Sequence, residues 1–385
     1  MLINAKEFSG ETSLETQINT IVEQIKIIGR KKLDFAQLLH NHPKAIQELP
    51  ERLKKDLDPQ YEFWTPISKT DLHSLTIAGV DGGLTTKSLM GCDLFLCRSV
   101  SVIITYARDG IFRTSYYPTR APRPDLLLSL SPVAKSEFER LAGFYRAKLE
   151  VTTAEQLINS SDKSIDVILM DGSILPPATQ TQARVVRTSQ PQSELLEALR
   201  SLMEVAEENG VLLAWVIKNS RTARFIQFLG RIMPSLSSFI PGLLDTDYRS
   251  IVRTSRDLDF FFYMLPPSAR SFALKLTAED DPRLKDLYRD IWSFYIKPAR
   301  YDAPLRIEIA QQPDISSTDV NLFIKQACSI ILPLSQFHSR YGLPAPIVEA
   351  DARSKIHENE FEAIIGQIQR RVGFAVEEKR SPFGF

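Results

Sequence analysis

Two aspartates in this sequence each end a short apolar run and each precede a glycine. Asp81 stands in "IAGVDGG" and Asp171 in "VILMDGS". A single Asp-Gly pair after a strand is usually only a turn, because both residues tolerate the backbone angles of turns. Two such aspartates on neighbouring strands would repel each other unless a cation lay between them, and Mg²⁺ and Mn²⁺ prefer carboxylate oxygens. The pair therefore favours a divalent metal site over two unrelated turns.

Glutamates between the two aspartates offer further metal ligands. Residues 131–160 have a helix-forming composition and begin with Ser131-Pro132, which is typical of a helix start. Glu139 and Glu150 are eleven residues apart, about three turns, so they share a face of that helix. An exposed, solvated helix face is the competing interpretation for both.

Three other charged residues stand at or on predicted strands. Lys218 follows the apolar run "VLLAWVI", where a lysine can bind phosphate or stabilise developing negative charge. The residue pattern alone favours an ordinary surface lysine. Arg306 and Glu308 alternate with apolar residues in "APLRIEIA" and so share a face of a strand. Such pairs are usually cross-strand surface charges, and phosphate contact by Arg306 is the alternative.

The order of predicted elements indicates how the sheet is built. Strands at 75–83, 93–107 and 111–118 are followed by a helix, a strand at 164–173, a helix, a strand ending near 218 and a helix. Three hairpin-linked strands followed by helix-linked crossovers make a mixed sheet. This order is that of the ribonuclease H-like fold, in which the first and fourth strands are parallel neighbours. Their carboxyl ends, and hence Asp81 and Asp171, then lie side by side.

The remaining segments divide the chain into two expected parts. Residues 1–70 are predicted to be a helical extension, with Ile18, Ile21 and Ile25 among apolar residues at helical spacing. Residues 71–385 are predicted to form the main α/β domain. From about 257 onward, including "DLDFFFYMLPP", the chain looks more β and irregular. That part either extends the sheet or forms a separate lobe, before helices at 317–332 and 347–373.

Composition excludes several classes of protein. Lys+Arg and Asp+Glu both number 47, so no global charge indicates a nucleic-acid or membrane partner. The three cysteines form no CxxC pair, and no secretory signal or membrane-length apolar run is apparent, so we expect a cytoplasmic protein without a membrane partner. No HExxH, GxxxxGK[ST], GxGxxG or GxSxG occurs, which argues against a zinc hydrolase, P-loop, Rossmann or α/β-hydrolase site.

Six short segments, taken in order, resemble the NurA family of nucleases. They are "GVDGG", "RAKLE", "VILMDGSIL", "VIKNSRT", "LRIEIA" and "YGLPAPIVEADARSKI". The resemblance covers roughly residues 75 to 375. It implies a ribonuclease H-like fold and an Mn²⁺- or Mg²⁺-dependent nuclease that cuts single-stranded DNA and resects duplex ends by two-metal phosphodiester hydrolysis in DNA repair. It also implies a homodimer that docks on the hexameric HerA translocase.

The resemblance assigns roles residue by residue. Asp81, Asp171 and Glu150 match the family's acids, and the spacing to the second aspartate selects Glu150 over Glu139. Lys218 matches the lysine of the K-x-S-R motif. Asp351 occupies the position of the last metal ligand, where many members carry histidine, and His357 is the alternative. These assignments make Asp81, Glu150, Asp171 and Lys218 catalytic and add Asp351 to the metal ligands.

DNA contact is expected from further residues. Arg306 and Glu308 match the R-x-E strand of the family, and with Lys218 and Arg221 they are the predicted substrate-binding residues. Arg120, Arg123, Arg184 and Arg221 are the candidates for a basic groove whose binding weakens with salt.

Two other functions compete with the nuclease. "VDGGLTTK" is similar to the Asp-Gly-Thr phosphate loop of actin- and sugar-kinase-like ATPases, but "MDGSILPP" runs into prolines where that class has a second phosphate turn. An inactive scaffold of a translocase complex is the other alternative, and the presence of all the predicted acids disfavours it.

Overall fold

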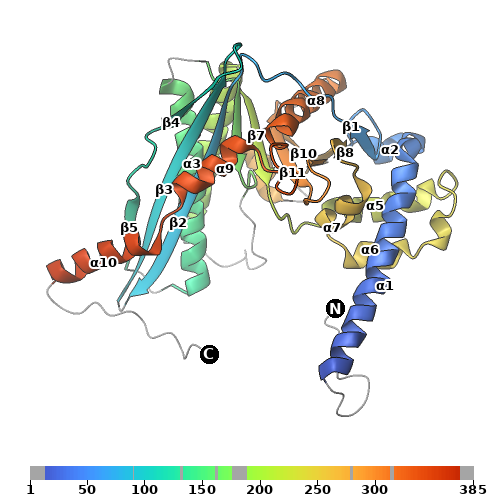
Figure 1. Ribbon diagram of the computed structural model, residues 1–385, viewed down its shortest axis with the longest axis horizontal. Coiled ribbons are helices and arrows are strands. Elements are labelled where there is room, and N and C mark those ends of the chain that lie inside the picture. Colours follow the sequence, from blue (N-terminus) through green and yellow to red (C-terminus); the bar gives the residue numbers. More distant parts are fainter. Residues whose placement is uncertain are drawn as a thin grey trace.

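The computed structural model describes residues 14–89, 91–130, 133–160, 164–175, 189–277, 281–312 and 316–372. Its strands form one mixed sheet in the order β1-β8-β10-β11-β7-β6-β2-β3-β4, with β5 paired to β3 and β9 to β10 (Figure 1). Helices cover both faces of this sheet.

The amino-terminal strands form an antiparallel hairpin series followed by parallel crossovers. These strands are β2 (Thr76–Leu89), β3 (Cys92–Tyr106), β4 (Phe112–Tyr117), β5 (Asp125–Ser129), β6 (Val167–Asp171) and β7 (Leu212–Ile217). β2 pairs antiparallel with β3 and parallel with β6, and β6 pairs parallel with β7. The predicted ribonuclease H-like order, with the first and fourth strands as parallel neighbours, is confirmed. Strand β5 was not predicted.

Side chains of the central strands point alternately to the two faces of the sheet, and each face is covered by a hydrophobic core. Val167 and Leu169 of β6 face a core shared with α8 (Ser317–Leu334) and α9 (Ala345–Ser354). Ile168 and Met170 face the other core, shared with α3 (Lys135–Ser160) and α4 (Ser189–Glu208). Because both faces are covered, these strands are apolar at nearly every position.

The carboxyl-terminal half extends the sheet, which answers the question that the sequence left open. Strand β11 (Leu305–Gln311) pairs antiparallel with β7, and β10 (Asp290–Lys297) pairs with β11. Two short strands, β8 (Ala269–Ser271) and β9 (Leu274–Leu276), pair with β10, and β1 (Trp64–Pro66) pairs with β8.

Helices beside β8 and β10 enclose a third core that takes in part of the amino-terminal segment. These helices are α5 (Arg224–Leu236), α6 (Tyr248–Thr254) and α7 (Asp257–Met264), with a 3-10 turn at Leu243–Asp245. A second 3-10 turn, Pro282–Leu287, packs in the core shared with α3 and α4. Helix α1 (Leu14–Asn41) contributes Phe35 and Leu39 to the third core, and η2 (Pro43–Glu48) and α2 (Glu51–Lys54) follow it. The earlier part of α1, drawn in blue, projects away from the other elements (Figure 1). The proposed boundary at residue 70 stays a prediction.

Two local expectations were wrong. Residues 257–264 form helix α7 instead of β or irregular structure, because Phe260, Phe261 and Met264 bury against α1 and α5. Tertiary packing overrides the β propensity of the phenylalanine run. Asp257 is also buried, and its carboxylate accepts the Ile226 N–H, which secures the helix against α5.

The predicted helix at 347–373 is instead two helices, α9 and α10 (Glu358–Val372). At the break, the guanidinium of Arg98 donates hydrogen bonds to the backbone carbonyls that end α9. Its Nε donates to the Ser354 carbonyl at 3.0 Å and its Nη2 to the Lys355 carbonyl at 2.6 Å, and it also pairs with Glu360. Among the described residues, no helix combines the length and apolarity required to cross a membrane.

Candidate active site

Three aspartates converge where β6 ends at Asp171, beside Asp81 in the middle of β2. In the parallel pairing of these strands Val80 lies opposite Met170, so Asp81 and Asp171 come next on each strand. Asp351 reaches the same point from α9. One carboxylate oxygen from each of the three lies within 4.8 Å of the others. The predicted adjacency of Asp81 and Asp171 is thus present, and Asp351, which the family resemblance makes a metal ligand, lies with them.

Glycines on β2 allow α9 to approach closely enough for this convergence. A Cβ on Gly79 would lie 2.4 Å from the backbone carbon of Pro346, and one on Gly83 would lie 1.9 Å from the Ser354 carbonyl oxygen. Both contacts are with backbone, so no larger side chain fits at either position. The close approach places the Ser354 hydroxyl 3.0 Å from Oδ2 of Asp81, to which it donates.

Lys218 lies beside the three aspartates, at the end of β7. Its Nζ is 3.2 Å from Oδ2 of Asp171 and 3.8 Å from Oδ1 of Asp351. Burial lowers the pKa of Lys218, but attraction to Asp171 and Asp351 outweighs it, and the pKa is raised above its ordinary value. The ammonium group therefore stays charged at neutral pH and offsets part of the acidic cluster.

Glu150 approaches the site from the opposite face of the sheet. It lies on α3, is almost fully buried, and its Oε1 accepts no hydrogen bond from the described residues. A Cβ on Gly82 would lie 2.5 Å from this oxygen, so glycine there makes room for the carboxylate. The Nε of Arg146 is 3.6 Å away on the next turn of α3. Glu139, the alternative, is exposed and pairs with Lys135.

Burial raises the pKa values of the acids in this region. The pKa of Asp81 is raised to about 6 by burial, with repulsion from Asp171 adding to it. The pKa of Glu150 is raised to about 8 by burial, although Arg146 opposes the shift. Burial also raises the pKa of Asp171, against the attraction of Lys218. The positive charges nearby thus do not balance these carboxylates when they are ionised. A hard divalent cation, which prefers carboxylate oxygens, would balance them.

A comparison with protein families identifies this arrangement. The family model described as the NurA domain matches residues 75–356. The chain belongs to the NurA family. The matched residues include Asp81, Glu150, Asp171, Lys218 and Asp351, and they exclude α1.

The chain is also similar to solved structures of NurA proteins. The NurA nuclease from Sulfolobus solfataricus is 16% identical, with 93% of this chain and 97% of that chain covered and a TM-score of 0.50. A second NurA structure is 11% identical, covering 80% and 91% of the two chains at a TM-score of 0.43. A NurA structure with manganese is 12% identical, covering 91% and 98% at 0.39. The search of curated proteins found no match.

The R-x-E pair of this NurA domain lies inside the fold, next to the site. Arg306 Nη2 is 2.6 Å from Glu308 Oε1, and both side chains are buried. Glu308 Oε2 accepts the Ser173 hydroxyl and the Ile174 N–H, directly after Asp171. Arg306 Nη1 donates to the Ser220 and Thr222 hydroxyls, directly after Lys218. The pair therefore connects the loop after β6 with the loop after β7. Substrate contact by Arg306 and Glu308 stays a prediction.

The other predicted residues lie at the surface or outside the described parts. Arg120, Arg123 and Arg221 are exposed, and Arg221 lies in the loop after Lys218. Arg184 lies outside the described residues. His357 is exposed and does not belong to the group of three aspartates. Lys87, in the segment that is similar to a phosphate loop, lies on strand β2 and pairs with Glu362 of α10.

Sequence reasoning missed Arg146 and Ser354. Arg146 precedes Glu150 by four residues, and this spacing places the two on one helix face, so the pair was detectable as an i,i+4 ion pair. Ser354 was not detectable, because it is 273 residues from Asp81 and only the packing of α9 on β2 brings them together.

Proposed function

We propose that this protein is a metal-dependent DNA nuclease that hydrolyses phosphodiester bonds. The supporting observation is the cluster of Asp81, Asp171 and Asp351, with Lys218 beside it, where the parallel strands β6 and β7 end in a NurA domain. Open α/β sheets place their sites at this edge. The NurA protein from Sulfolobus solfataricus, which shares the fold, is a nuclease.

Asp81, Asp171 and Asp351 would hold Mn²⁺ or Mg²⁺, with Glu150 as a further ligand from the other face. The bound cation would act as a Lewis acid toward the scissile phosphate and activate water for attack. Oxygen-only donors favour these hard cations over zinc, which prefers nitrogen and sulfur ligands. The Oε1 of Glu150 supports its inclusion, since this buried carboxylate oxygen accepts no hydrogen bond from the described residues and has only the ion pair with Arg146.

The chain itself positions the charges that the reaction needs. The Gly82 N–H and the Ser354 hydroxyl bind the two oxygens of Asp81, at 2.8 Å and 3.0 Å, and so orient its carboxylate. Lys218 holds a positive charge at the rim and would stabilise negative charge developing on the phosphate. Arg221, and Arg306 with Glu308 behind it, would contact or support the DNA backbone.

The finer parts of the proposal come from the family resemblance. The substrates would be single-stranded DNA and duplex ends, bound through Arg120, Arg123 and Arg221 in a salt-sensitive manner. The protein would act in DNA end resection and repair, in the cytoplasm, as a homodimer docked on a HerA-type hexameric ATPase. Stimulation of duplex-end degradation by such an ATPase with ATP would support this partnership, and its absence would contradict it.

A cleavage assay tests the nuclease. Purified protein is incubated with single-stranded DNA and Mn²⁺, Mg²⁺ or EDTA. We expect cleavage only with metal, and a rate lower by a factor of about 10³ for Asp81→Asn and Asp171→Asn, since metal ligation is worth several kcal/mol in the transition state. Asp286→Asn, at an exposed aspartate, is the matched control.

Three outcomes would contradict the proposal. Cleavage that persists in EDTA, or Asp81→Asn cutting as fast as Asp286→Asn, would exclude the metal site as the catalytic centre. ATP hydrolysis by the protein alone, without DNA cleavage, would favour the kinase-like ATPase. Absence of both activities would favour the inactive scaffold.

A further inference from the structure

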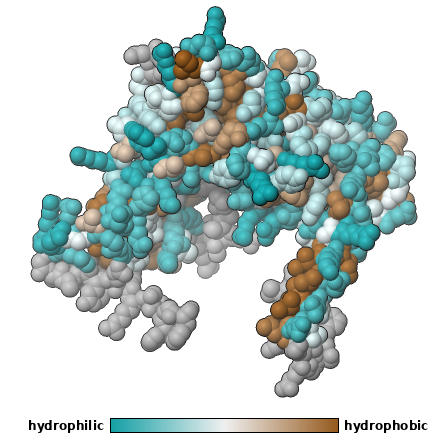
Figure 2. Space-filling model, in the orientation of Figure 1, coloured by the Kyte–Doolittle hydropathy of each residue, from teal (hydrophilic) through white to brown (hydrophobic). Residues whose placement is uncertain are grey.

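Helix α10 begins two residues after the matched NurA domain ends, yet it is packed against that domain. Phe361 and Ile365 of α10 are buried in one apolar cluster with residues of the β2–β3 hairpin, along which the helix lies (Figure 1). The apolar residues of the projecting part of α1 differ, since Ile18 and Ile25 are exposed in a hydrophobic stripe (Figure 2). Helix α10 is therefore a docked part of the molecule, and its contacts can affect the site.

Arg98 of β3 connects α10 with the end of α9. Its Nη1 and Nη2 donate to the two carboxylate oxygens of Glu360 on α10, at 3.1 Å and 3.0 Å. The same guanidinium donates to the carbonyls of Ser354 and Lys355 at the end of α9. A forked pair of charge-assisted hydrogen bonds fixes the orientation of a guanidinium more strictly than a single bond does. Glu360 thus holds Arg98 in the orientation that serves α9.

The end of α9 that Arg98 contacts is also the end that contacts the three aspartates. Ser354 donates its hydroxyl to Asp81, while its carbonyl accepts a hydrogen bond from Arg98. Gly83 stands opposite Arg98 in the β2–β3 pairing, and its lack of a side chain leaves room for that carbonyl. Asp351 lies three residues before Ser354 on the same helix. A shift of this helix end would therefore move a hydrogen-bond donor of Asp81 and the Asp351 carboxylate together.

We propose that Glu360 and Arg98 are positioning residues for the metal centre. Glu360 orients the guanidinium, the guanidinium holds the end of α9, and α9 in turn presents Ser354 and Asp351 to the site. Neither Glu360 nor Arg98 belongs to the group of three aspartates. The inference rests on the proposed metal-dependent nuclease, and it gives a helix outside the matched family domain a part in the reaction.

The carboxylate charge of Glu360 is needed because its partner is buried. Arg98 is 9% exposed, and a buried cation that loses its counter-charge is costly. In Glu360→Gln the amide offers one acceptor oxygen where the carboxylate offered two, so the guanidinium must move or lose a hydrogen bond. Either change loosens its contact with α9. Groups that orient metal ligands commonly change metal affinity or activity by about 10–100-fold when they are replaced.

Calorimetric titration of the full chain with Mn²⁺ tests the proposal without measuring activity. We expect the apparent Kd for Mn²⁺ to rise about 10-fold in Glu360→Gln and about 100-fold in Arg98→Lys, because lysine keeps the charge but loses the forked donors. Cleavage of single-stranded DNA should show a lower kcat, with KM for DNA changed by less than about twofold. Thermal unfolding in EDTA checks that each variant is folded at the titration temperature.

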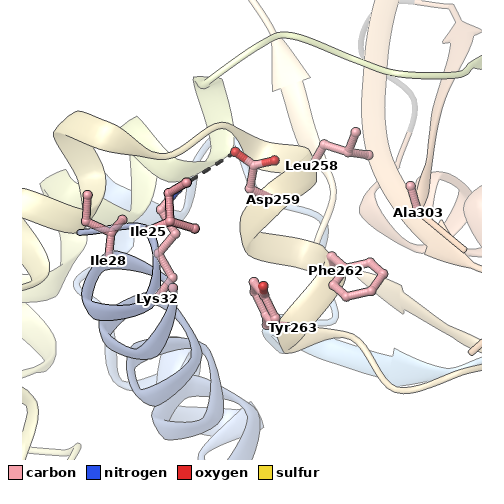
Figure 3. A pocket seen from close by; sticks show the side chains of 9 residues that line it. Ile25, Ile28, Lys32, Leu258, Asp259, Phe262, Tyr263 and Ala303 are labelled. Atoms are coloured by element: carbon pink, nitrogen blue, oxygen red, sulfur yellow. Dashed lines mark ion pairs between the residues drawn. The ribbon is translucent and has the colours of Figure 1, made fainter. Parts of the chain in front are cut away.

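Two other ion pairs provide matched controls. Glu362→Gln removes the acid of α10 that pairs with Lys87 of the hairpin. Asp259→Asn removes the acid that pairs with Lys32 beside the cleft of about 420 Å³ between α1 and α7 (Figure 3). That pair resembles the β3–α10 pair in exposure, with the cation 14% and the acid 49% exposed against 10% and 33%. Both controls should bind Mn²⁺ with an apparent Kd within about twofold of the native value, as expected for sites that do not couple.

Three outcomes would overturn the inference. Unchanged Mn²⁺ affinity in both Glu360→Gln and Arg98→Lys would exclude the positioning role and leave the nuclease standing. An equal loss of affinity in Glu362→Gln and Glu360→Gln would show that docking of α10 as a whole, and not the contact with Arg98, sets the affinity. A native protein that neither binds Mn²⁺ nor cleaves DNA would contradict the proposed function and, with it, this inference.

Discussion

The guanidinium of Arg306 lies 2.6 Å from the carboxylate of Glu308, and the pair bonds to the loops that follow Asp171 and Lys218. Asp171 is the last residue of β6 and Lys218 follows the last residue of β7, so strand pairing does not fix the chain beyond either residue. A buried, hydrogen-bonded pair that contacts both loops sets the distance between them. This geometry indicates that Arg306 and Glu308 position Asp171 and Lys218, the proposed catalytic residues.

Arg306→Lys tests that positioning role, because lysine keeps the charge but loses the forked donors. We expect kcat on single-stranded DNA to fall about tenfold or more while KM for DNA changes by less than about twofold. The free energy of unfolding should also fall, by up to about 3–5 kcal/mol if the pair is broken outright. An increased KM at unchanged kcat would instead show that Arg306 binds the substrate, as the family resemblance implies.

Removal of single ligands should reveal the metal site without any activity measurement. Saturating Mn²⁺ should raise the melting temperature of the native protein, since a ligand at 100 times its Kd stabilises by about 2.7 kcal/mol. Asp81→Asn and Asp171→Asn should abolish most of that increase, and Asp351→Asn should reduce it. His357→Ala, at an exposed residue outside the cluster, should leave it unchanged. If His357→Ala alone loses the Mn²⁺-induced rise in melting temperature, His357 is the ligand in place of Asp351.

Gly82→Ala and Gly83→Ala should have different effects although the residues are adjacent. The new Cβ at position 82 meets side chains only, first the Glu150 carboxylate, and a side chain moves more easily than backbone. We therefore expect reduced cleavage with a stability loss of about 1–3 kcal/mol, the usual range for overpacking. The new Cβ at position 83 meets the Ser354 carbonyl, which is backbone, so the larger loss of stability should occur there. Urea unfolding of both variants measures the difference, and equal losses would refute it.

The raised pKa values predict that the metal-free protein loses stability as pH rises. Glu150 has an ordinary pKa of 4.5 and a folded pKa of about 8, so between these values the folded state holds a proton that the unfolded state has released. Stability from this group is full below pH 4.5 and falls as pH rises toward 8, by at most about 1.4 kcal/mol per pH unit.

Denaturation in EDTA at several pH values measures this slope. Asp81 adds to it between its ordinary pKa of 3.8 and about 6. Glu150→Gln cannot ionise at this position, so it should flatten the dependence of unfolding free energy on pH between pH 6 and 8. This window lies above the folded pKa of Asp81, about 6, and reaches the folded pKa of Glu150, about 8. A native slope that Glu150→Gln leaves unchanged would show that Glu150 is not the titrating group.

Much of the central site was predictable because its signals are local. Asp81 and Asp171 follow strands whose composition and order are readable along the chain, and the hairpin and crossover rules then place the two strands together. Glu150 and Lys218 were harder, since the residue pattern left Glu139 and a plain surface lysine open. The family's motif spacing selected both, and the structure places them next to the aspartates.

The amino-acid sequence alone determined the order of strands, the first two acids and the apolar repeat of α1, because periodicity and strand ends depend on near neighbours. Only the tertiary structure decided the rest. The packing of α9 brings Asp351 to the other two aspartates, and α9 ends where its last carbonyl accepts a hydrogen bond from Arg98. Residues 257–264 are helical, and Arg306 is buried in an ion pair with Glu308. Each of these depends on contacts between residues far apart in the chain, and such contacts leave no periodic signal in the sequence.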